Sequence, residues 1–474
     1  MRESVMENVY ESPFSGRYSS EEMLRLFSKR TRHETWRRLW VELARAECEL
    51  GLPIRQEQVD ELAAHVGDID YAVVEAKERE IRHDVMAHIY AYGLVCPNAA
   101  GILHLGATSC YVTDNADLVL YRDALRLIRA ELIPVLRNLR DFARRYRALP
   151  TLGYTHLQPA QLVTVGKRAC LWIQDLWMDL EELDGVSGRL RFLGCRGTTG
   201  TEASFVELFN GDTTKIDRMN RMIADAFGFE KLFAVSGQTY PRKLDAQVLN
   251  CLSAIATSCY RFANDLRLLQ HMRQIEEPSE SAQVGSSAMA YKRNPMRSER
   301  ICSLARYAMT NALNGPATAS VQWFERTLDD SAIRRISLPE GFLCVDAILR
   351  LMKNVTGGLR VYPKVIAKAV GEWLPFIATE NLLMASVKKG GNRQESHEII
   401  REHSLSVADA AKNGETLDLL RLLAEDDRFN LSAAEIEAAL RPEDFVGRSA
   451  EQVDQFLDSL PLPDSDVETG EISV

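Results

Sequence analysis

Residues 243–276 read KLDAQVLNCLSAIATSCYRFANDLRLLQHMRQIE, a stretch of 34 residues without Gly or Pro. Its apolar residues recur at helical spacing and cover most of the surface of the helix that they predict. A helix that is apolar on more than one face needs packing partners on several sides. The stretch therefore predicts a bundle of long helices that also packs against other subunits.

Two further stretches repeat this pattern, and strand signals are weak. Residues 115–148 carry an apolar stripe at helical spacing and follow Asp114 and Asn115, which can cap a helix. Residues 161–190 carry a second stripe, and no Asn-Gly hairpin lies between alternating runs. We predict an all-α fold of three helical regions, with a long central helix bundle that forms the oligomer core.

Turn-rich segments suggest where the regions divide. One lies at 101–115, before the first long helix, and another runs from Gly357 to Pro363. We predict an N-terminal helical domain at 1–108, a central long-helix bundle domain at 109–361, and a C-terminal helical domain at 362–474. The acidic, Pro-containing tail from about 461 is expected to be disordered.

Composition narrows the classes of function. The chain has 474 residues, 46% hydrophobic content and a net charge of −10. It shows no secretory leader and no membrane-length apolar run, which predicts a cytoplasmic protein with no membrane partner. Its nine Cys form no CxxC pair, which favours free thiols over disulfides or zinc. The negative charge argues against nucleic acid as a partner. We expect no metal and no cofactor.

The segment 281–300, SAQVGSSAMAYKRNPMRSER, is basic within this acidic chain. A Gly followed by small polar residues favours a loop whose backbone can approach a ligand. Lys292 could fold back over a bound anion, and Asn294 before Pro295 indicates a turn with an amide to offer. Most charge runs are solvated surface loops, but the opposite sign of this one favours a small anionic ligand.

A second cluster, TLGYTHLQPAQ at 151–161, contains His156 beside Thr155. Pro159 suits the first turn of a following helix, so we expect His156 at a helix entry, positioned to exchange protons. A helix N-terminus disfavours imidazolium, so a proton donor there needs a nearby carboxylate. A lone His is more often a structural residue.

Two more clusters offer polar groups near predicted helix starts. Thr108 and Ser109, within GATSCYVTDN, present hydroxyls and backbone N–H groups that suit a carboxylate. His83 and His88, around Asp84, lie five residues apart and are poorly aligned for a shared metal. We expect His83 to touch the ligand and His88 to be structural.

The segment RTLDDSAIRR, 326–335, brings Arg326, Ser331 and Arg335 to four- or five-residue spacing. Two guanidinium groups and a hydroxyl can form a phosphate clamp, to which Arg17 and Tyr18 could add. Surface ion pairs with the neighbouring Asp329 and Asp330 are an equally good interpretation of the spacing. The Gly-rich run at 197–201 lacks the Gly-Lys-Ser/Thr of a P-loop.

The order of these clusters along the chain resembles the three separated conserved regions of the fumarase/aspartase superfamily. Within it, RHDVMAH, LGATSCYVTDN, TLGYTHLQPAQLVTVGKR, SGQTYPRK, GSSAMAYKRNPMRSER and ERTLDDSAIRR resemble the adenylosuccinate lyases. The resemblance is strong from Arg17 to Arg335 and weaker in the C-terminal third.

This resemblance implies a reaction and a role for each cluster. The family eliminates fumarate from adenylosuccinate, giving AMP, and from succinylaminoimidazole carboxamide ribotide. It forms homotetramers whose sites combine three subunits. Ser286 would be the base and His156 the acid, aided by Lys292 and His83. The implied carboxylate-binding residues, with Asp84 nearby, are Lys292, Asn294, Thr108, Ser109, Thr155 and Gln238. Arg300 would also bind substrate, and the implied phosphate-binding residues are Arg17, Tyr18, Arg326, Ser331 and Arg335.

Two departures from the family pattern keep alternatives open. Ala290 stands where the family usually has Pro, and Ile333 where it usually has Asn. We expect Ala290 to slow loop closure, and Ile333 to weaken nucleotide binding. A sister lyase such as argininosuccinate lyase would leave the phosphate-type residues without a role. A non-catalytic structural protein that keeps the fold is the third hypothesis.

Overall fold

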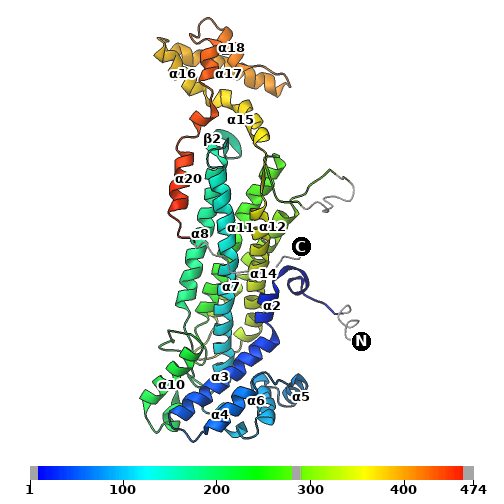
Figure 1. The fold of residues 1–474 in the computed structure, drawn as a ribbon, viewed down its shortest axis with the longest axis vertical. Helices are drawn as coiled ribbons and strands as arrows, with labels where there is room; N and C mark the ends of the chain where they lie inside the picture. Colours follow the sequence, from blue (N-terminus) through cyan, green and yellow to red (C-terminus); the bar gives the residue numbers. More distant parts are fainter. Residues whose placement is uncertain (1–8, 280–288, 290, 463–474) are drawn as a thin grey trace.

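The computed structural model describes residues 9–279, 289 and 291–462, and the chain forms a long helical rod (Figure 1). Five helices run along its middle: α7 (Ser109–Arg145), α8 (Val165–Arg189), α11 (Lys243–His271), α12 (Met296–Asn311) and α14 (Asp330–Gly357). The structure confirms the all-α fold class, since strands in the described residues are few and short.

The prediction for 243–276 is confirmed over most of its length, since α11 occupies 29 residues of it. Many of its apolar residues lie inside the bundle, and Val248, Ile255, Phe262 and Leu266 are 0% exposed, whereas Leu268 is 43% exposed. Burying this much apolar surface drives the helix together with its neighbours.

Smaller elements gather at the two ends of the rod (Figure 1). One end and the adjoining flank carry η1 (Phe14–Tyr18), α2 (Glu21–Leu26), α3 (Lys29–Glu49), α4 (Gln56–Ala64), α5 (Tyr71–Ile81), α6 (Asp84–Val95), η2 (Ala100–Ile102), α9 (Ala203–Leu208), α10 (Thr213–Ala226) and α13 (Asn314–Ser320). The opposite end carries α15 (Pro363–Ile377), α16 (Thr379–Lys388), α17 (Arg393–Lys412), α18 (Leu419–Glu425), α19 (Ala433–Ala438) and η3 (Pro442–Phe445).

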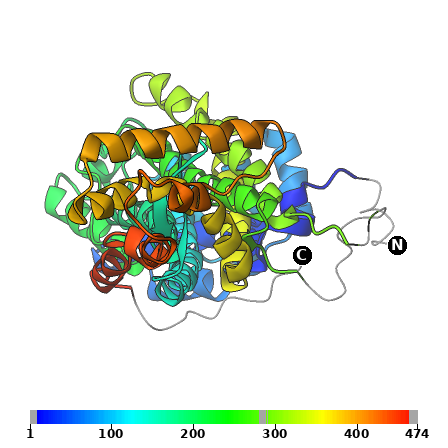
Figure 2. The same cartoon turned by 90° about the horizontal axis from the view of Figure 1, so that it is seen from above.

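The far end has its own small core. Leu382, Ile399, Leu423 and Ile436 pack together, apart from the main core. Seen along the rod, α16 and α17 lie across its end (Figure 2). Helix α20 (Ser449–Asp458) then returns to pack on α8 and α7. The three-domain division stays a prediction, and most of the predicted disordered tail lies outside the described residues.

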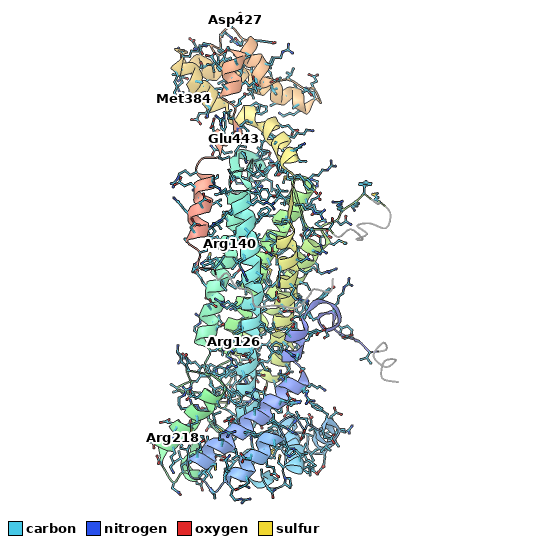
Figure 3. All side chains as sticks on the ribbon, in the orientation of Figure 1. Arg126, Arg140, Arg218, Met384, Asp427 and Glu443 are labelled. Atoms are coloured by element: carbon cyan, nitrogen blue, oxygen red, sulfur yellow. The ribbon has the colours of Figure 1, made fainter. Side chains whose placement is uncertain are left out.

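Figure 3 shows how far apart these parts lie. Arg126 and Arg140 mark successive points along α7 on the shaft, while Arg218 lies at one end and Asp427 at the other. An α-helix rises about 1.5 Å per residue, so the 37 residues of α7 span about 55 Å.

Helix α7 starts earlier than the predicted helix at 115–148. It begins at Ser109, so Asp114 and Asn115 are buried inside it rather than capping it. Asp114 pairs with Arg242, and the Asn115 amide accepts the backbone N–H groups of Leu193 and Gly194. These two polar residues are buried because they bind partners that lie far away in the sequence. They do not cap a helix end.

A β-hairpin replaces the helix entry expected at His156. Strand β1 (Pro150–Thr155) pairs antiparallel with β2 (Gln158–Thr164), and α8 begins only at Val165. His156 and Leu157 form the turn with φ of 52° and 57°, as in a type I′ hairpin. Pro159 therefore lies in a strand, and the helix-dipole argument for His156 was wrong. A second short pair joins β3 (Ile275–Glu276) to β4 (Arg360–Val361).

No helix in the described part of the chain is long and apolar enough to cross a membrane.

Candidate active site

Four helices begin at one end of the bundle, and eight of the predicted site residues lie within five residues of these starts. The helices are α6, α7, α11 and α14. Helix N-termini carry partial positive charge and free N–H groups, which suit an anionic ligand. We call these residues the start cluster: His83, Asp84, Thr108, Ser109, Gln238, Arg326, Ser331 and Arg335.

His83 and Ser109 join α6 to α7. His83 caps α6 by accepting the Met86 backbone N–H at Nδ1, 3.3 Å away. Its Nε2 lies 3.4 Å from Ser109 Oγ. Both side chains remain accessible to solvent, so they can exchange this contact for a ligand.

Asp84 and Arg335 join α6 to α14. Arg335 Nη2 donates to Asp84 Oδ2 at 3.1 Å. Burial alone would raise the pKa of Asp84, but the Val85 N–H and the Arg335 guanidinium outweigh it and lower that pKa. Asp84 is therefore an anion that holds Arg335, and the Arg335 side chain is itself exposed.

Arg326 forms an ion pair with a buried partner, and its role toward a ligand stays a prediction. Its Nη1 donates to Asp330 Oδ1 at 2.8 Å, and Asp330 is completely buried. The Arg326 side chain keeps 25% of its surface exposed. The pair leaves one side of the guanidinium facing outward.

Gln238 joins the start cluster to the Gly-rich run at 197–201. Its Oε1 accepts from Cys110 on α7, and its Nε2 donates to the Thr198 carbonyl at 3.0 Å. The neighbouring backbones approach so closely that a Cβ on Gly200 would lie 1.9 Å from the Ser236 carbonyl oxygen. The Gly-rich run is a packing element in this position.

A second group forms around Tyr18. The guanidinium carbons of Arg17 and Arg300 lie 5.8 Å and 5.6 Å from its ring centroid. The backbone that follows Tyr18 is held from α14, since Asp346 accepts both the Ser20 N–H and the Ser20 hydroxyl. Asp346 lies about three helical turns along α14 from Arg335. The structure thus brings three predicted phosphate- or substrate-binding residues together on the flank of the bundle.

Thr155 and His156 lie at the other end of α7 from the start cluster. The hairpin begins at Pro150, shortly after α7 ends at Arg145, and both side chains are exposed. The hairpin has a bulge between Leu152 and Tyr154. Gly153 lies in this bulge, where a Cβ would lie 2.6 Å from the Gln161 carbonyl oxygen. A single chain therefore does not bring His156 to His83 or Ser109.

The remaining predictions fall in or beside the 281–300 segment. Lys292 and Asn294 lie between the end of α11 and the start of α12, with Lys292 exposed. The residues that flank this segment are joined to each other, because Glu277 accepts the backbone N–H groups of Arg297 and Ser298 at 3.0 Å and 2.8 Å. Ser286 and Ala290 lie outside the described residues.

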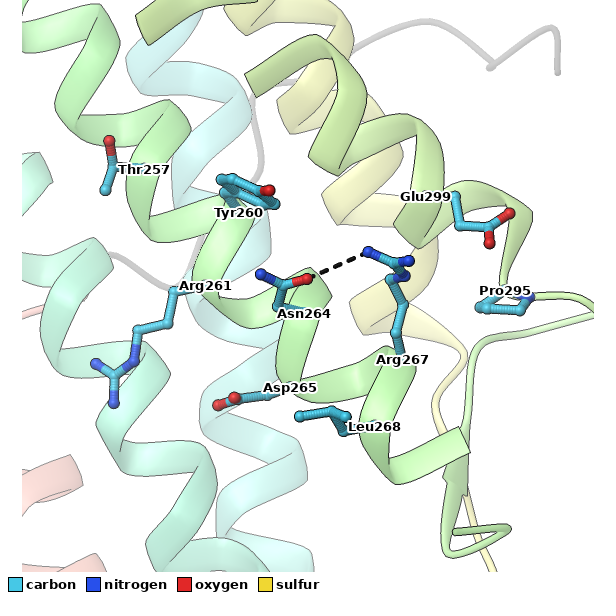
Figure 4. Close-up of a pocket in the computed structure, with 9 residues that line it drawn as sticks. All are labelled: Thr257, Tyr260, Arg261, Asn264, Asp265, Arg267, Leu268, Pro295 and Glu299. Atoms are coloured by element: carbon cyan, nitrogen blue, oxygen red, sulfur yellow. Dashed lines mark hydrogen bonds between the residues drawn. The ribbon is translucent and has the colours of Figure 1, made fainter. Parts of the chain in front are cut away.

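A groove of about 850 Å³ runs along the outer side of α11 (Figure 4). Tyr260, Asn264 and Arg267 line it from α11, and Pro295 and Glu299 from the start of α12. None of the predicted site residues that the structure describes lines it. Among the described residues, no group of three or more His, Cys, Asp or Glu could hold a metal ion.

Sequence reasoning missed the residues that hold the start cluster from below. Arg242 and Asp114 are buried and joined by two hydrogen bonds, although 128 residues separate them. In the sequence, Arg242 lies in the motif SGQTYPRK and Asp114 directly precedes the predicted helix at 115–148. Spacing along the chain does not reveal that the two residues pair.

Comparisons with known proteins concern the chain as a whole. Residues 16–309 match the family described as "Lyase", and residues 375–456 match "Adenylosuccinate lyase C-terminus". The adenylosuccinate lyase of Saccharomyces cerevisiae is 49% identical over 94% of both chains, and that of Schizosaccharomyces pombe is 48% identical over the same shares. The chain belongs to the adenylosuccinate lyase family.

Solved structures of more distant relatives share the family's fold. The 3-carboxy-cis,cis-muconate lactonizing enzyme of Pseudomonas putida aligns with a TM-score of 0.81 at 22% identity, over 94% of this chain and 98% of that one. A fumarate lyase from Mesorhizobium sp. BNC1 gives 0.79 at 23%, over 95% and 100%. At these identities the likeness concerns the fold alone.

Proposed function

We propose that this chain is a carbon–nitrogen lyase that eliminates fumarate from adenylosuccinate, giving AMP, and from succinylaminoimidazole carboxamide ribotide. The observation that carries the proposal is the 49% identity to an adenylosuccinate lyase over 94% of both chains. The start cluster supports it, because four helix starts and several Arg residues suit a substrate with carboxylates and a phosphate.

The chemistry assigns each group a task. The reaction removes a proton from a carbon next to a carboxylate, and that carbon is barely acidic. Lys292 and Asn294 would stabilise the negative charge that forms, together with Thr108 and Ser109. Arg326, Ser331 and Arg335 would hold the phosphate, aided by Arg17, Tyr18 and Arg300 in the second group.

Two proton transfers complete the elimination. Ser286 would remove the proton, which requires activation by the nearby Lys292 because a Ser hydroxyl is a weak base. His156 would protonate the leaving nitrogen. Its place at the tip of an exposed hairpin leaves the imidazole free to enter a site made by other parts of the assembly.

A site that contains both His156 and the start cluster requires more than one chain. About 55 Å of helix α7 separates the two within a subunit. We therefore propose a homotetramer whose active sites combine residues of different subunits, in the cytoplasm. The exposed groove on α11 is compatible with packing between long helices, as the apolar pattern of 243–276 predicted.

An ultraviolet assay tests the proposed function. Purified protein should convert adenylosuccinate and succinylaminoimidazole carboxamide ribotide, releasing fumarate from each, and should leave argininosuccinate unchanged. Turnover of argininosuccinate instead would contradict the substrate assignment, and the absence of turnover with all three would contradict the enzymatic function.

A further inference from the structure

We propose that Asp330 is a positioning residue that fixes Arg326 for the substrate phosphate, anchored through Arg242 to helix α7. The inference rests on the proposed function and deepens it. In this inference, a buried carboxylate contributes to nucleotide affinity although it does not contact the ligand.

Each oxygen of Asp330 serves a different guanidinium. Oδ1 accepts from Arg326 Nη1 at 2.8 Å, and Oδ2 accepts from Arg242 Nε at 2.6 Å. Asp330 is the first residue of α14 and is 0% exposed. It therefore cannot reach a ligand itself, while the partly exposed Arg326 can.

Arg242 holds this carboxylate in place from the other side. Its Nη1 and Nη2 donate to the two oxygens of Asp114 at 2.8 Å and 3.2 Å. Asp114 belongs to α7 and also accepts the Tyr240 backbone N–H at 3.0 Å. The chain of contacts thus ties the start of α14 to α7 and to the segment before α11, with fixed bidentate geometry.

Arg326 keeps part of its hydrogen-bonding capacity for a ligand. Its two bonds within the described residues, to Asp330 Oδ1 and to the Thr327 carbonyl, both use Nη1. Nη2 and Nε remain for an outer anion. Because ordering a long side chain on binding reduces affinity, a guanidinium already fixed by a buried carboxylate binds phosphate more tightly.

The charge of Asp330 is secure at neutral pH. Burial would raise its pKa, but Arg242, Arg326 and Arg334 outweigh burial and lower the pKa. The carboxylate therefore remains an acceptor for both guanidinium groups.

The same buried network provides a matched control. Arg334 donates from Nε to Asp245 Oδ2 at 2.6 Å and from Nη2 to Asp117 Oδ2 at 3.0 Å. Asp245 is 2% exposed, and within the described part of the chain its carboxylate accepts hydrogen bonds from Tyr240 and Arg334, neither of which is a predicted substrate-binding residue. Removing its charge disturbs the core as removing that of Asp330 does, without releasing Arg326.

The test compares Asp330→Asn with Asp245→Asn in the full-length protein. We expect Asp330→Asn to raise the KM for adenylosuccinate and the inhibition constant of AMP about tenfold, since charge-assisted hydrogen bonds carry this much affinity. The inhibition constant of fumarate, which has no phosphate, should stay unchanged, and kcat should change by less than about threefold. Asp245→Asn should leave all four values near those of the unmodified protein.

Further variants separate the possible results. In an Arg326→Ala background, Asp330→Asn should add no further loss of AMP binding if it acts through Arg326. If Asp330→Asn does not fold, Asp330→Glu keeps the charge but shifts the carboxylate by one methylene, and AMP binding must still weaken. Unchanged AMP binding in a folded Asp330 variant, or equal losses in both Asn variants, would overturn the inference. Failure of the unmodified protein to bind AMP would contradict the proposed function as well.

Discussion

The two ends of helix α7 are built in opposite ways. At the start cluster, buried Asp and Arg side chains hold the surrounding helices together, and the candidate binding groups lie on top of this network. At the hairpin, His156 is exposed on a two-residue turn. The difference shows that one end is held together by buried contacts within the subunit, while the other presents an exposed imidazole outward.

Substituting the hairpin tip should abolish chemistry and spare stability. For His156→Ala we expect kcat to fall about 10²- to 10⁴-fold, because the leaving nitrogen loses its proton donor. The free energy of unfolding should change by less than about 0.5 kcal/mol, since an exposed side chain is removed. Assay of fumarate release together with urea unfolding measures both, and Leu157→Ala is the neighbouring control. A variant that keeps its kcat would exclude His156 as the acid.

In contrast, a substitution in the buried network that supports the start cluster should lower the stability of the protein. For Arg242→Met we expect a loss of about 3–5 kcal/mol in the free energy of unfolding, because the buried carboxylates of Asp114 and Asp330 lose the guanidinium that they share. Arg129→Met, which breaks an exposed pair with Asp184, should cost less than about 1 kcal/mol. Urea unfolding compares the two variants. Equal losses would mean that the buried network does not hold this end together.

The pH dependence of stability gives a third test of the end of the molecule that carries the start cluster. Glu47 on α3 is 0% exposed, and neither of its carboxyl oxygens has a partner in the described residues. Burial raises its pKa to about 9, so the folded protein holds its proton at neutral pH. Its contribution to stability is complete below its unfolded pKa of about 4.5 and is lost as the pH rises toward about 9.

Glu47→Gln should therefore flatten this pH dependence. At pH 8 the variant should be more stable than the unmodified protein by more than about 1 kcal/mol, with little difference near pH 5. Urea unfolding at both values measures the effect. A variant that is less stable at pH 8 would show that Glu47 is ionised and paired in the folded protein.

The same contrast explains which parts of the molecule could be predicted. The long helices follow from apolar residues repeated within each stretch, a local signal that 243–276 carries along nearly all of α11. The hairpin was missed because its turn consists of His156 and Leu157, which rarely adopt positive φ, rather than Asn-Gly. Its conformation depends on strand pairing and packing.

The candidate residues themselves were easier to predict than their arrangement. The motifs named His83, Ser109 and Arg335, and the structure brings all three to one end of the bundle. Spacing could not decide whether Arg326 pairs with Asp330 or faces a ligand, because the same four- or five-residue spacing suits both an ion pair and a phosphate clamp. Nor could it show Arg242 beneath them, since that contact depends on how three helices pack.

Mixing two inactive variants tests the central claim, that each active site combines the start cluster of one chain with the hairpin of another. His156→Ala and His83→Ala should each show almost no turnover alone. When the two chains are co-expressed and mixed oligomers are isolated, we predict that fumarate release from adenylosuccinate returns, because some sites then receive an intact residue from each chain. Mixed oligomers as inactive as the separate variants would contradict the shared site.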